Sequence, residues 1–149
     1  MPTILNPAPA VTLPDEVYGL CNYFTPNETE ASFLAGIPVE TTEQASEAAQ
    51  IFIERGVKTA VITLGENGVY VQNSNISQHI PAFNMGNKVI ETTGAGDAFN
   101  GGFAYALSEG IPLTEAVRYG SATAAISVTR LGTAPAMPYK PEIQKLLDS

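Results

Sequence analysis

The chain has 149 residues, of which 44% are hydrophobic and 15% charged, and this balance excludes a disordered chain and indicates one globular domain over residues 1–149. Its formal net charge of −8 argues against binding to nucleic acid or an anionic membrane, because both need clusters of Lys and Arg. No apolar run approaches the ~20 residues of a membrane span, and the first residues lack a secretion signal, so we expect a cytoplasmic protein whose partners are small molecules or proteins.

The first part of the sequence alternates predicted strands and helices. Residues 3–5 form a short apolar run that predicts a buried strand, residues 13–20 predict a short helix, and residues 23–25 predict a second strand. Few folds begin with a buried strand at their first residues. We therefore expect the chain to be the latter part of a larger architecture.

A capping box signature predicts where the next helix begins. Thr25 supplies the capping hydroxyl, Pro26 stands at the first helical position, and Glu28 follows three residues after the threonine. The helix is expected to run to about Leu34 and to end at Gly36.

A longer helix and a continuous β-prone run come next. Residues 42–55 carry alanines and two larger apolar residues at helical spacing, and residues 59–64 follow as an apolar strand. A buried strand directly after a helix is typical of a parallel sheet in a layered α/β fold. Residues 69–71 and 76–80 alternate more weakly, as the strands of a meander do.

The last part of the chain predicts three helices. Residues 98–107 and 112–128 have helical patterns, and the second half of the latter is almost entirely apolar, which indicates burial. Residues 141–147 predict a short amphipathic helix whose docking face consists of Ile143, Leu146 and Leu147.

The segment from Thr92 to Asp97 leads into a predicted helix through two glycines. That geometry leaves backbone N–H groups unpaired, and Gly94 and Gly96 allow close approach of a phosphate. Asp97 beside such a site fits a base that takes the proton from a hydroxyl attacking a γ-phosphoryl group, while the amides stabilise the developing charge. The alternative, which residue types alone favour, is that Asp97 caps the helix.

Two further motifs carry candidate chemistry. Residues 63–68 form a glycine loop at the carboxyl end of the best strand, where open α/β sheets bind ligands, although Asn67-Gly68 is also an ordinary tight-turn dipeptide. Asn27 and Glu30 lie three residues apart on one helix face and could converge on a hydrated cation, although a solvated acidic face explains Glu30 equally well. Cys21 is interpreted as a core residue and the lone His79 as a weak metal candidate.

These motifs occur in the order found in the ribokinase (PfkB) family of carbohydrate kinases, and the chain resembles the C-terminal half of that family from end to end. The segments that match its ribokinase branch are residues 5–10, 25–30, 63–65, 92–97 and 100–101. The resemblance implies a three-layer α/β fold with a mainly parallel sheet, flanking helices and a small antiparallel meander. The family's sugar-binding N-terminal half and β-sheet lid are absent from this sequence.

The resemblance also implies an ATP-dependent transfer of phosphate to a sugar, most simply D-ribose, with Mg²⁺ as a cofactor. Asp97 is then the general base, and the amides of Gly94, Ala95 and Gly96 form the anion hole. Asn27 and Glu30 act through water on magnesium and the phosphates. The residues that line the nucleotide pocket are Thr63, Gly65, Gly68 and Ser121, the last standing where ribokinases often carry a larger polar residue.

Family members also hold a potassium ion next to the anion hole. The resemblance implies that backbone oxygens of Thr93, Ser127, Arg130 and Gly132 bind it here. Two positions depart from the family pattern, because Glu91 stands where Asp is usual and Ala136 where ribokinase offers a hydroxyl.

Loss of the N-terminal half would expose a sheet edge, so we expect the chain to associate with itself or with a separate N-terminal half. We also expect that the chain alone binds nucleotide weakly and does not phosphorylate a sugar. Two alternatives stay open, a non-catalytic nucleotide-binding or assembly fragment and a nucleoside or vitamin kinase of the same superfamily.

Overall fold

The computed structural model describes residues 3–7, 12–82, 95–127 and 140–147. The chain divides into two compact units, an N-terminal unit of residues 1–81 and a C-terminal unit of residues 82–149. Each unit is described by itself. In the described residues no helix is long and apolar enough to cross a membrane.

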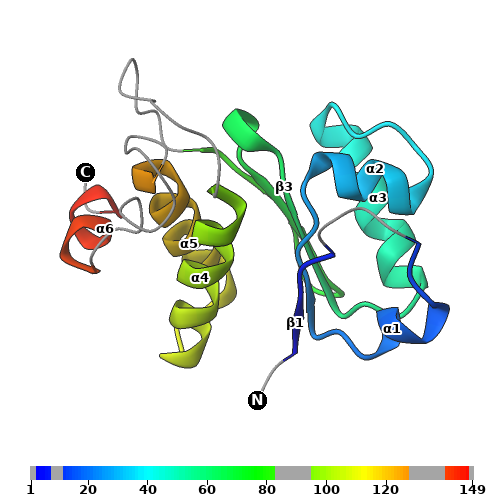
Figure 1. Cartoon of the computed structure of the whole chain (residues 1–149), viewed down its shortest axis with the longest axis horizontal. Coiled ribbons are helices and arrows are strands. Elements are labelled where there is room, and N and C mark those ends of the chain that lie inside the picture. The colour runs from blue at the N-terminus through cyan, green and yellow to red at the C-terminus, as the bar shows by residue number, and fades with distance from the viewer. Residues whose placement is uncertain (1–2, 8–11, 83–94, 128–139, 148–149) are drawn as a thin grey trace. The chain divides into compact units, whose positions relative to one another are not determined.

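The N-terminal unit is built on a five-stranded sheet in the order of the sequence (Figure 1). The first three strands run parallel to one another, and the third, fourth and fifth strands form an antiparallel meander. The predicted strands and the predicted change from parallel to antiparallel pairing are therefore confirmed. The strands are β1 (Ile4–Leu5), β2 (Tyr23–Phe24), β3 (Thr59–Thr63), β4 (Val69–Gln72) and β5 (Ser77–Ile80).

Three helices connect the parallel strands of this unit, α1 (Asp15–Gly19), α2 (Glu28–Ala35) and α3 (Thr42–Glu54). The first is shorter than the 13–20 expected from its pattern, and the third agrees with the expected 42–55. Helices α2 and α3 pack against β3 on one face of the sheet (Figure 1). The apolar spacing of α3 accounts for this placement, because its alanines and Phe52 are fully buried.

The predicted capping box of α2 is wrong by two residues. Asn27, not Thr25, caps the helix, and its partner is Glu30, not Glu28. The reason lies in the sheet, because the amide of Thr25 donates to the carbonyl of Leu5 at 2.9 Å and its hydroxyl donates to the same oxygen at 3.3 Å. Thr25 therefore extends the β1–β2 pairing, and the helix begins after the next residue with a capping group.

An aromatic cluster forms the centre of the N-terminal unit. The rings of Tyr18, Phe24 and Phe52 lie within 6.2 Å of one another, centroid to centroid. The Arg55 guanidinium stacks over the Tyr18 ring at 5.3 Å and donates to the carbonyl of Leu34 at 2.7 Å. This cation–π contact and hydrogen bond join α1, α2 and the end of α3 around the core.

Cys21 is buried in the same core, as the sequence indicated, and its thiol donates to the carbonyl of Val17 at 3.2 Å. Burial raises the pKa of the Cys21 thiol, because a thiolate loses solvation there. The thiol therefore stays protonated at neutral pH, which fits a packing role.

The described part of the C-terminal unit consists of three helices, α4 (Ala95–Ser108), α5 (Leu113–Ser127) and α6 (Lys140–Leu147). Helix α4 begins three residues before the expected Ala98, which places Gly96 and Asp97 inside its first turn. Ile143 of α6 is buried and Leu146 and Leu147 are half-buried, as its docking face requires.

Helices α4 and α5 pack at very short range through two glycines. A Cβ on Gly102 would lie 2.3 Å from the Thr123 hydroxyl oxygen, and a Cβ on Gly120 would lie 2.9 Å from the carbonyl oxygen of Phe99. Both distances are too short for real carbon atoms, so only glycine allows the two backbones this close. The contact fixes the position of α4 against α5.

Candidate functional site

Residues of the predicted cation motif and of the predicted nucleotide loop lie side by side in the N-terminal unit. The amide of Thr63, at the end of β3, donates to the carbonyl of Pro26 at 3.0 Å, and Asn27 and Thr63 form a parallel bridge. The residues directly before α2 are therefore attached to the carboxyl end of β3. Ligands bind at this end of parallel sheets.

The side chains of Asn27 and Glu30 cap the backbone of α2. Asn27 Oδ1 accepts from the Glu30 amide at 2.8 Å, and Glu30 Oε1 accepts from the Asn27 amide at 2.9 Å. Glu30 is 7% exposed, whereas Asn27 is exposed. Glu30 therefore has a structural role as a helix cap, which the sequence analysis assigned to Glu28 instead. The capping bond uses Oε1 of Glu30 and holds the second carboxylate oxygen at the end of the sheet.

The loop between β3 and β4 contains a short 3-10 turn (Gly65–Asn67) with glycines at both ends. Gly65 and Gly68 have positive φ angles of 59° and 92°, which other residues rarely adopt. The Leu64 amide donates to the Gly68 carbonyl at 2.8 Å and closes the loop at its base. The structure therefore shows a five-residue loop here and not a two-residue turn at Asn67-Gly68.

Glu28 is a neighbour of this loop that the sequence reasoning assigned only to capping. A Cβ placed on Gly65 would lie 3.6 Å from Glu28 Oε1. The carboxylate thus lies against the backbone of the loop. Its position one residue after Asn27, which bridges to Thr63, was the only sequence signal for this contact.

The first turn of α4 carries the predicted catalytic segment of the C-terminal unit. Gly96 and Asp97 are exposed, and no atom of the described residues lies within 4 Å of a Cβ placed on Gly96. Amides in a first helical turn have no partner inside the helix, and the helix dipole favours negative charge there. The arrangement can therefore bind an anion beside an exposed carboxylate.

Asn100 supports this turn, a role that the sequence reasoning did not assign. Its side-chain amide donates to the carbonyl of Gly96 at 2.9 Å. The spacing of four residues within one helix could have predicted the contact. The bond fixes the orientation of the peptide group between Gly96 and Asp97.

Ser121 is buried in α5, with 8% of its surface exposed. Its hydroxyl has no hydrogen-bond partner among the described residues, whereas the nearby Thr123 hydroxyl donates to the carbonyl of Tyr119 at 2.8 Å. A buried hydroxyl without a partner is costly, which is compatible with a role in ligand binding.

Several predicted site residues lie outside the described part of the chain, namely Glu91, Thr93, Gly94, Arg130, Gly132 and Ala136. The side chains of Ala95 and Ser127 are likewise not described, although both residues belong to helices. The anion hole is therefore described only at Ala95 and Gly96, and the potassium ligands stay predictions.

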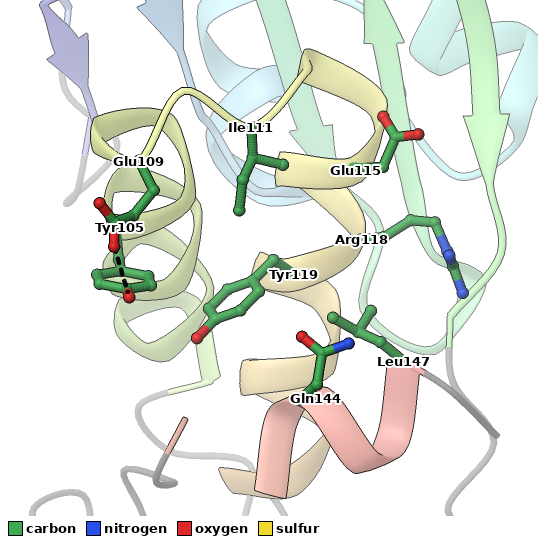
Figure 2. Close-up of a pocket in the computed structure, with 8 residues that line it drawn as sticks. All are labelled: Tyr105, Glu109, Ile111, Glu115, Arg118, Tyr119, Gln144 and Leu147. Atoms are coloured by element: carbon green, nitrogen blue, oxygen red, sulfur yellow. Dashed lines mark hydrogen bonds between the residues drawn. The ribbon is translucent and has the colours of Figure 1, made fainter. Parts of the chain in front are cut away.

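A hollow of about 350 Å³ opens between α4, α5 and α6 in the C-terminal unit (Figure 2). It lies at the far end of α4 from Asp97, because twelve residues at about 1.5 Å each separate Asp97 from Glu109 by about 18 Å. Its position separates it from the predicted anion site. The lining residues are Tyr105, Glu109, Ile111, Glu115, Arg118, Tyr119, Gln144 and Leu147.

Direct metal ligation finds no support in the described residues, because no three His, Cys, Asp or Glu side chains converge there. His79 instead has its ring Nε2 on the carbonyl oxygen of Asn67. A cation near Asn27 and Glu30 would accordingly be held through water and phosphate oxygens.

The pfkB family carbohydrate kinase pattern matches residues 1–140. The chain therefore belongs to the pfkB family of carbohydrate kinases.

Its relatives include ribokinases and deoxyribokinases. A ribokinase of Haemophilus influenzae is 45% identical over 145 residues, which are 97% of this chain and 47% of that protein. The structure of ribokinase from Thermotoga maritima has a TM-score of 0.87 at 42% identity and covers 98% of this chain and 48% of its own. The structure of Arabidopsis thaliana ribokinase complexed with ribose and ATP has a TM-score of 0.93 at 34% identity. The match includes 99% of this chain and 48% of the Arabidopsis chain. The chain spans about half the length of the curated relatives it matches.

Proposed function

We propose that this chain is the nucleotide-binding and catalytic half of an ATP-dependent sugar kinase, with D-ribose as the acceptor. Family membership supports the reaction class. The ribokinases among the relatives, one of them complexed with ribose and ATP, support the choice of sugar and nucleotide. The sugar itself would be bound by a second half of about equal length.

The single observation that carries the proposal is the position of Asp97. Its carboxylate is exposed in the first turn of α4, next to amides that have no partner inside the helix. An N-cap aspartate would stand one residue before the helix, whereas Asp97 is the third helical residue, the place that Glu30 has in α2, and unlike Glu30 it is exposed. Asp97 stands inside the helix, where it can accept a proton from outside.

The proposed transfer proceeds in line. The acceptor hydroxyl loses its proton to Asp97 while its oxygen forms a bond to the γ-phosphorus, and the bond from that phosphorus to the bridging oxygen of ADP breaks. The amides of Gly94, Ala95 and Gly96 donate to the equatorial oxygens of the transferred group. Asn100 contributes indirectly, because it fixes the carbonyl of Gly96.

In the proposal the nucleotide is bound by Thr63, Gly65 and Gly68 from the loop after β3 and by Ser121 from α5. The two positive-φ glycines support the first part, since they leave the loop backbone open to a ligand. The hydroxyl of Ser121, which has no partner among the described residues, supports the second.

The residues proposed for magnesium are Asn27 and Glu30. Their oxygen donors suit a hard cation, and the capping box holds both at the end of the sheet while leaving Glu30 a second carboxylate oxygen. Bound Mg²⁺ would neutralise charge on the phosphates. Potassium next to the anion hole is part of the proposal as well, through backbone oxygens of Thr93, Ser127, Arg130 and Gly132, with Glu91 beside them.

The proposal needs a partner for the sheet. Strand β1 ends the sheet order and pairs only with β2 among the described strands. An N-terminal half, or a second copy of the chain, would extend the sheet along this edge.

The test uses a chimera in which this chain replaces the 145 matching residues of the Haemophilus influenzae ribokinase. We expect ribose-dependent ADP formation by the chimera and a loss of kcat by roughly 10²- to 10⁴-fold for Asp97→Asn, with Mg-ATP binding unchanged. Glu109→Gln, at the far end of α4, is the matched control and should keep its activity. An Asp97→Asn chimera as active as its parent would remove Asp97 from the mechanism.

The competing function is a nucleotide-binding fragment without transfer, which the half-length match favours. The chimera distinguishes the two, because a chain that only binds nucleotide would leave the chimera without ribose-dependent ADP formation. Calorimetric binding of Mg-ADP without ribose phosphorylation is expected for the chain by itself, whereas ribose phosphorylation by the chain alone would show that no second half is needed.

A further inference from the structure

The only histidine of the chain contacts the proposed nucleotide loop from the outermost strand of the sheet. His79 lies on β5, opposite Tyr70, and Ile80 lies opposite Val69 at the start of β4. The loop of residues 64–68 comes immediately before Val69. The imidazole therefore reaches back along the sheet and places Nε2 on the carbonyl oxygen of Asn67.

The internal hydrogen bonds of the loop use the carbonyl groups of Leu64, Gly65 and Gly68. The Asn67 amide donates to the Leu64 carbonyl at 3.0 Å, the Gly68 amide to the Gly65 carbonyl at 3.2 Å, and the Leu64 amide to the Gly68 carbonyl at 2.8 Å. The carbonyl of Asn67 is bound instead by a side chain from a different element. That bond attaches the tip of the loop to β5.

The attachment matters because two glycines give the loop backbone a choice of conformations. Gly65 and Gly68 both have positive φ, and glycine backbones rotate easily between alternative conformations. A loop with two such residues loses more entropy when it becomes ordered than one made of other residues. A bond from a neighbouring strand therefore favours the one loop conformation that the structure shows.

The contact also determines which nitrogen of the ring carries hydrogen. A backbone carbonyl only accepts, so the neutral imidazole must be the Nε2–H tautomer, and the charged imidazolium donates in the same way. The ring acts here as a donor of fixed position. Nothing in this role requires a metal or a transferred proton.

We propose that His79 is a positioning residue that holds the loop of residues 64–68 in the conformation that receives the nucleotide, without touching the nucleotide itself. The inference rests on the proposed function only for the identity of the ligand. The attachment of the loop to β5 is testable without any ligand.

The first experiment measures amide hydrogen exchange in the nucleotide-free chain. In His79→Asn the side chain keeps an amide but is too short to reach the carbonyl of Asn67. In His79→Gln the amide nitrogen lies close to the place that Nε2 has in the wild type. Exchange at Leu64, Asn67 and Gly68 should be roughly twofold to tenfold faster in the Asn variant, the range of one net hydrogen bond, and near wild type in the Gln variant. Gln78→Ala, one residue away on the opposite face of β5, should leave these amides unchanged.

The second experiment determines the tautomer of the imidazole by NMR. With one histidine in the sequence, the imidazole nitrogens give one set of ¹⁵N resonances, and these should report the Nε2–H tautomer at a pH where the ring is neutral. An Nδ1–H tautomer, or exchange rates in His79→Asn equal to wild type, would overturn the attachment.

The third experiment connects the attachment to binding. Mg-ADP should bind roughly twofold to tenfold more weakly to His79→Asn and regain its affinity in His79→Gln. If His79→Asn bound Mg-ADP as tightly as wild type but exchanged its loop amides faster, the attachment of the loop to β5 would be supported and the positioning role disproved. If the wild-type chain binds no Mg-ADP, the proposed function fails and the positioning role fails with it, while the exchange rates still decide the attachment.

Discussion

The two units of the chain hold their proposed site residues by different means. In the N-terminal unit, Asn27 and Thr63 are joined through backbone pairing and a capping box, above a core of aromatic side chains. In the C-terminal unit, Asp97 depends on the placement of one helix, and that helix is positioned by the glycine contacts of Gly102 and Gly120 with α5.

This difference indicates which substitutions would displace the proposed site residues of each unit. A site made from backbone bonds within one sheet tolerates changes in distant side chains, because its geometry is set locally. A site at the end of a helix moves with the whole helix, so a change at a packing contact elsewhere on that helix can displace it. Substitutions in the two units should therefore differ both in the property that they change, stability or kcat, and in the size of the change.

The largest effect is expected from Phe52→Ala in the N-terminal core. The side chain is fully buried between Tyr18 and Phe24, and its loss should lower the free energy of unfolding of this unit by about 3–5 kcal/mol. Hydrogen exchange in residues 12–82 would measure the loss. Phe33→Ala, which removes a side chain that is 54% exposed, is the control and should change it little. An equal loss of protection in α4 would contradict the separation of the two cores.

The next effect is expected from Gly120→Ala in the C-terminal unit. The added methyl group would lie 2.9 Å from the carbonyl oxygen of Phe99, which belongs to the backbone and moves only with α4. The cost should be about 1–3 kcal/mol of unfolding free energy, as for other overpacked sites. Thermal unfolding measures it.

Gly19→Ala is the matched control, because no atom in the described part of the chain lies within 4 Å of its added carbon. In the ribokinase chimera, Gly120→Ala should also lower kcat more than it raises the KM for ATP, since α4 carries Asp97. A stable Gly120→Ala protein with normal kcat would show that the close contact does not position the helix.

A smaller effect is expected from Asn27→Ala. It removes the cap of α2 and should cost about 0.5–2 kcal/mol of unfolding free energy. Asn27→Asp restores a capping oxygen and should recover the stability while still differing in Mg-ADP affinity. Equal Mg-ADP affinity in all three proteins would restrict Asn27 to capping.

The smallest effect is expected from the pH dependence of Cys21. Burial raises the pKa of its thiol above the usual value of 9.0, so the folded chain holds this proton more tightly than the unfolded chain. The corresponding stability is complete below pH 9.0 and is lost as the pH rises through the folded pKa.

Comparison with Cys21→Ala isolates this contribution from other groups that titrate there. Wild type should lose more stability than the variant between neutral and alkaline pH, measured by urea unfolding. Parallel curves would mean that the thiol ionises alike in the folded and unfolded states.

Much of the fold was predictable because its signals are local. The helical spacing of residues 42–55, the β-prone run after it and the weaker alternation of the last two strands all depend on side chains near one another in sequence. The family motifs are local as well, so Asp97, Asn27 and the loop after β3 could be chosen as candidate site residues from residue types and order, and their roles stay predictions. The early start of α4 at Ala95 was missed, because glycines there obscure the helical pattern.

The sequence by itself therefore determined the family, the order of the elements and the candidate chemical groups. Only the tertiary structure decided which of two adjacent capping signatures opens α2, because Thr25 is engaged by the carbonyl of Leu5 from a strand twenty residues earlier. It also decided that Asn27 meets Thr63 and that His79 reaches Asn67. These contacts join residues far apart in the chain, and their partners are set by how strands pair, which no local pattern contains.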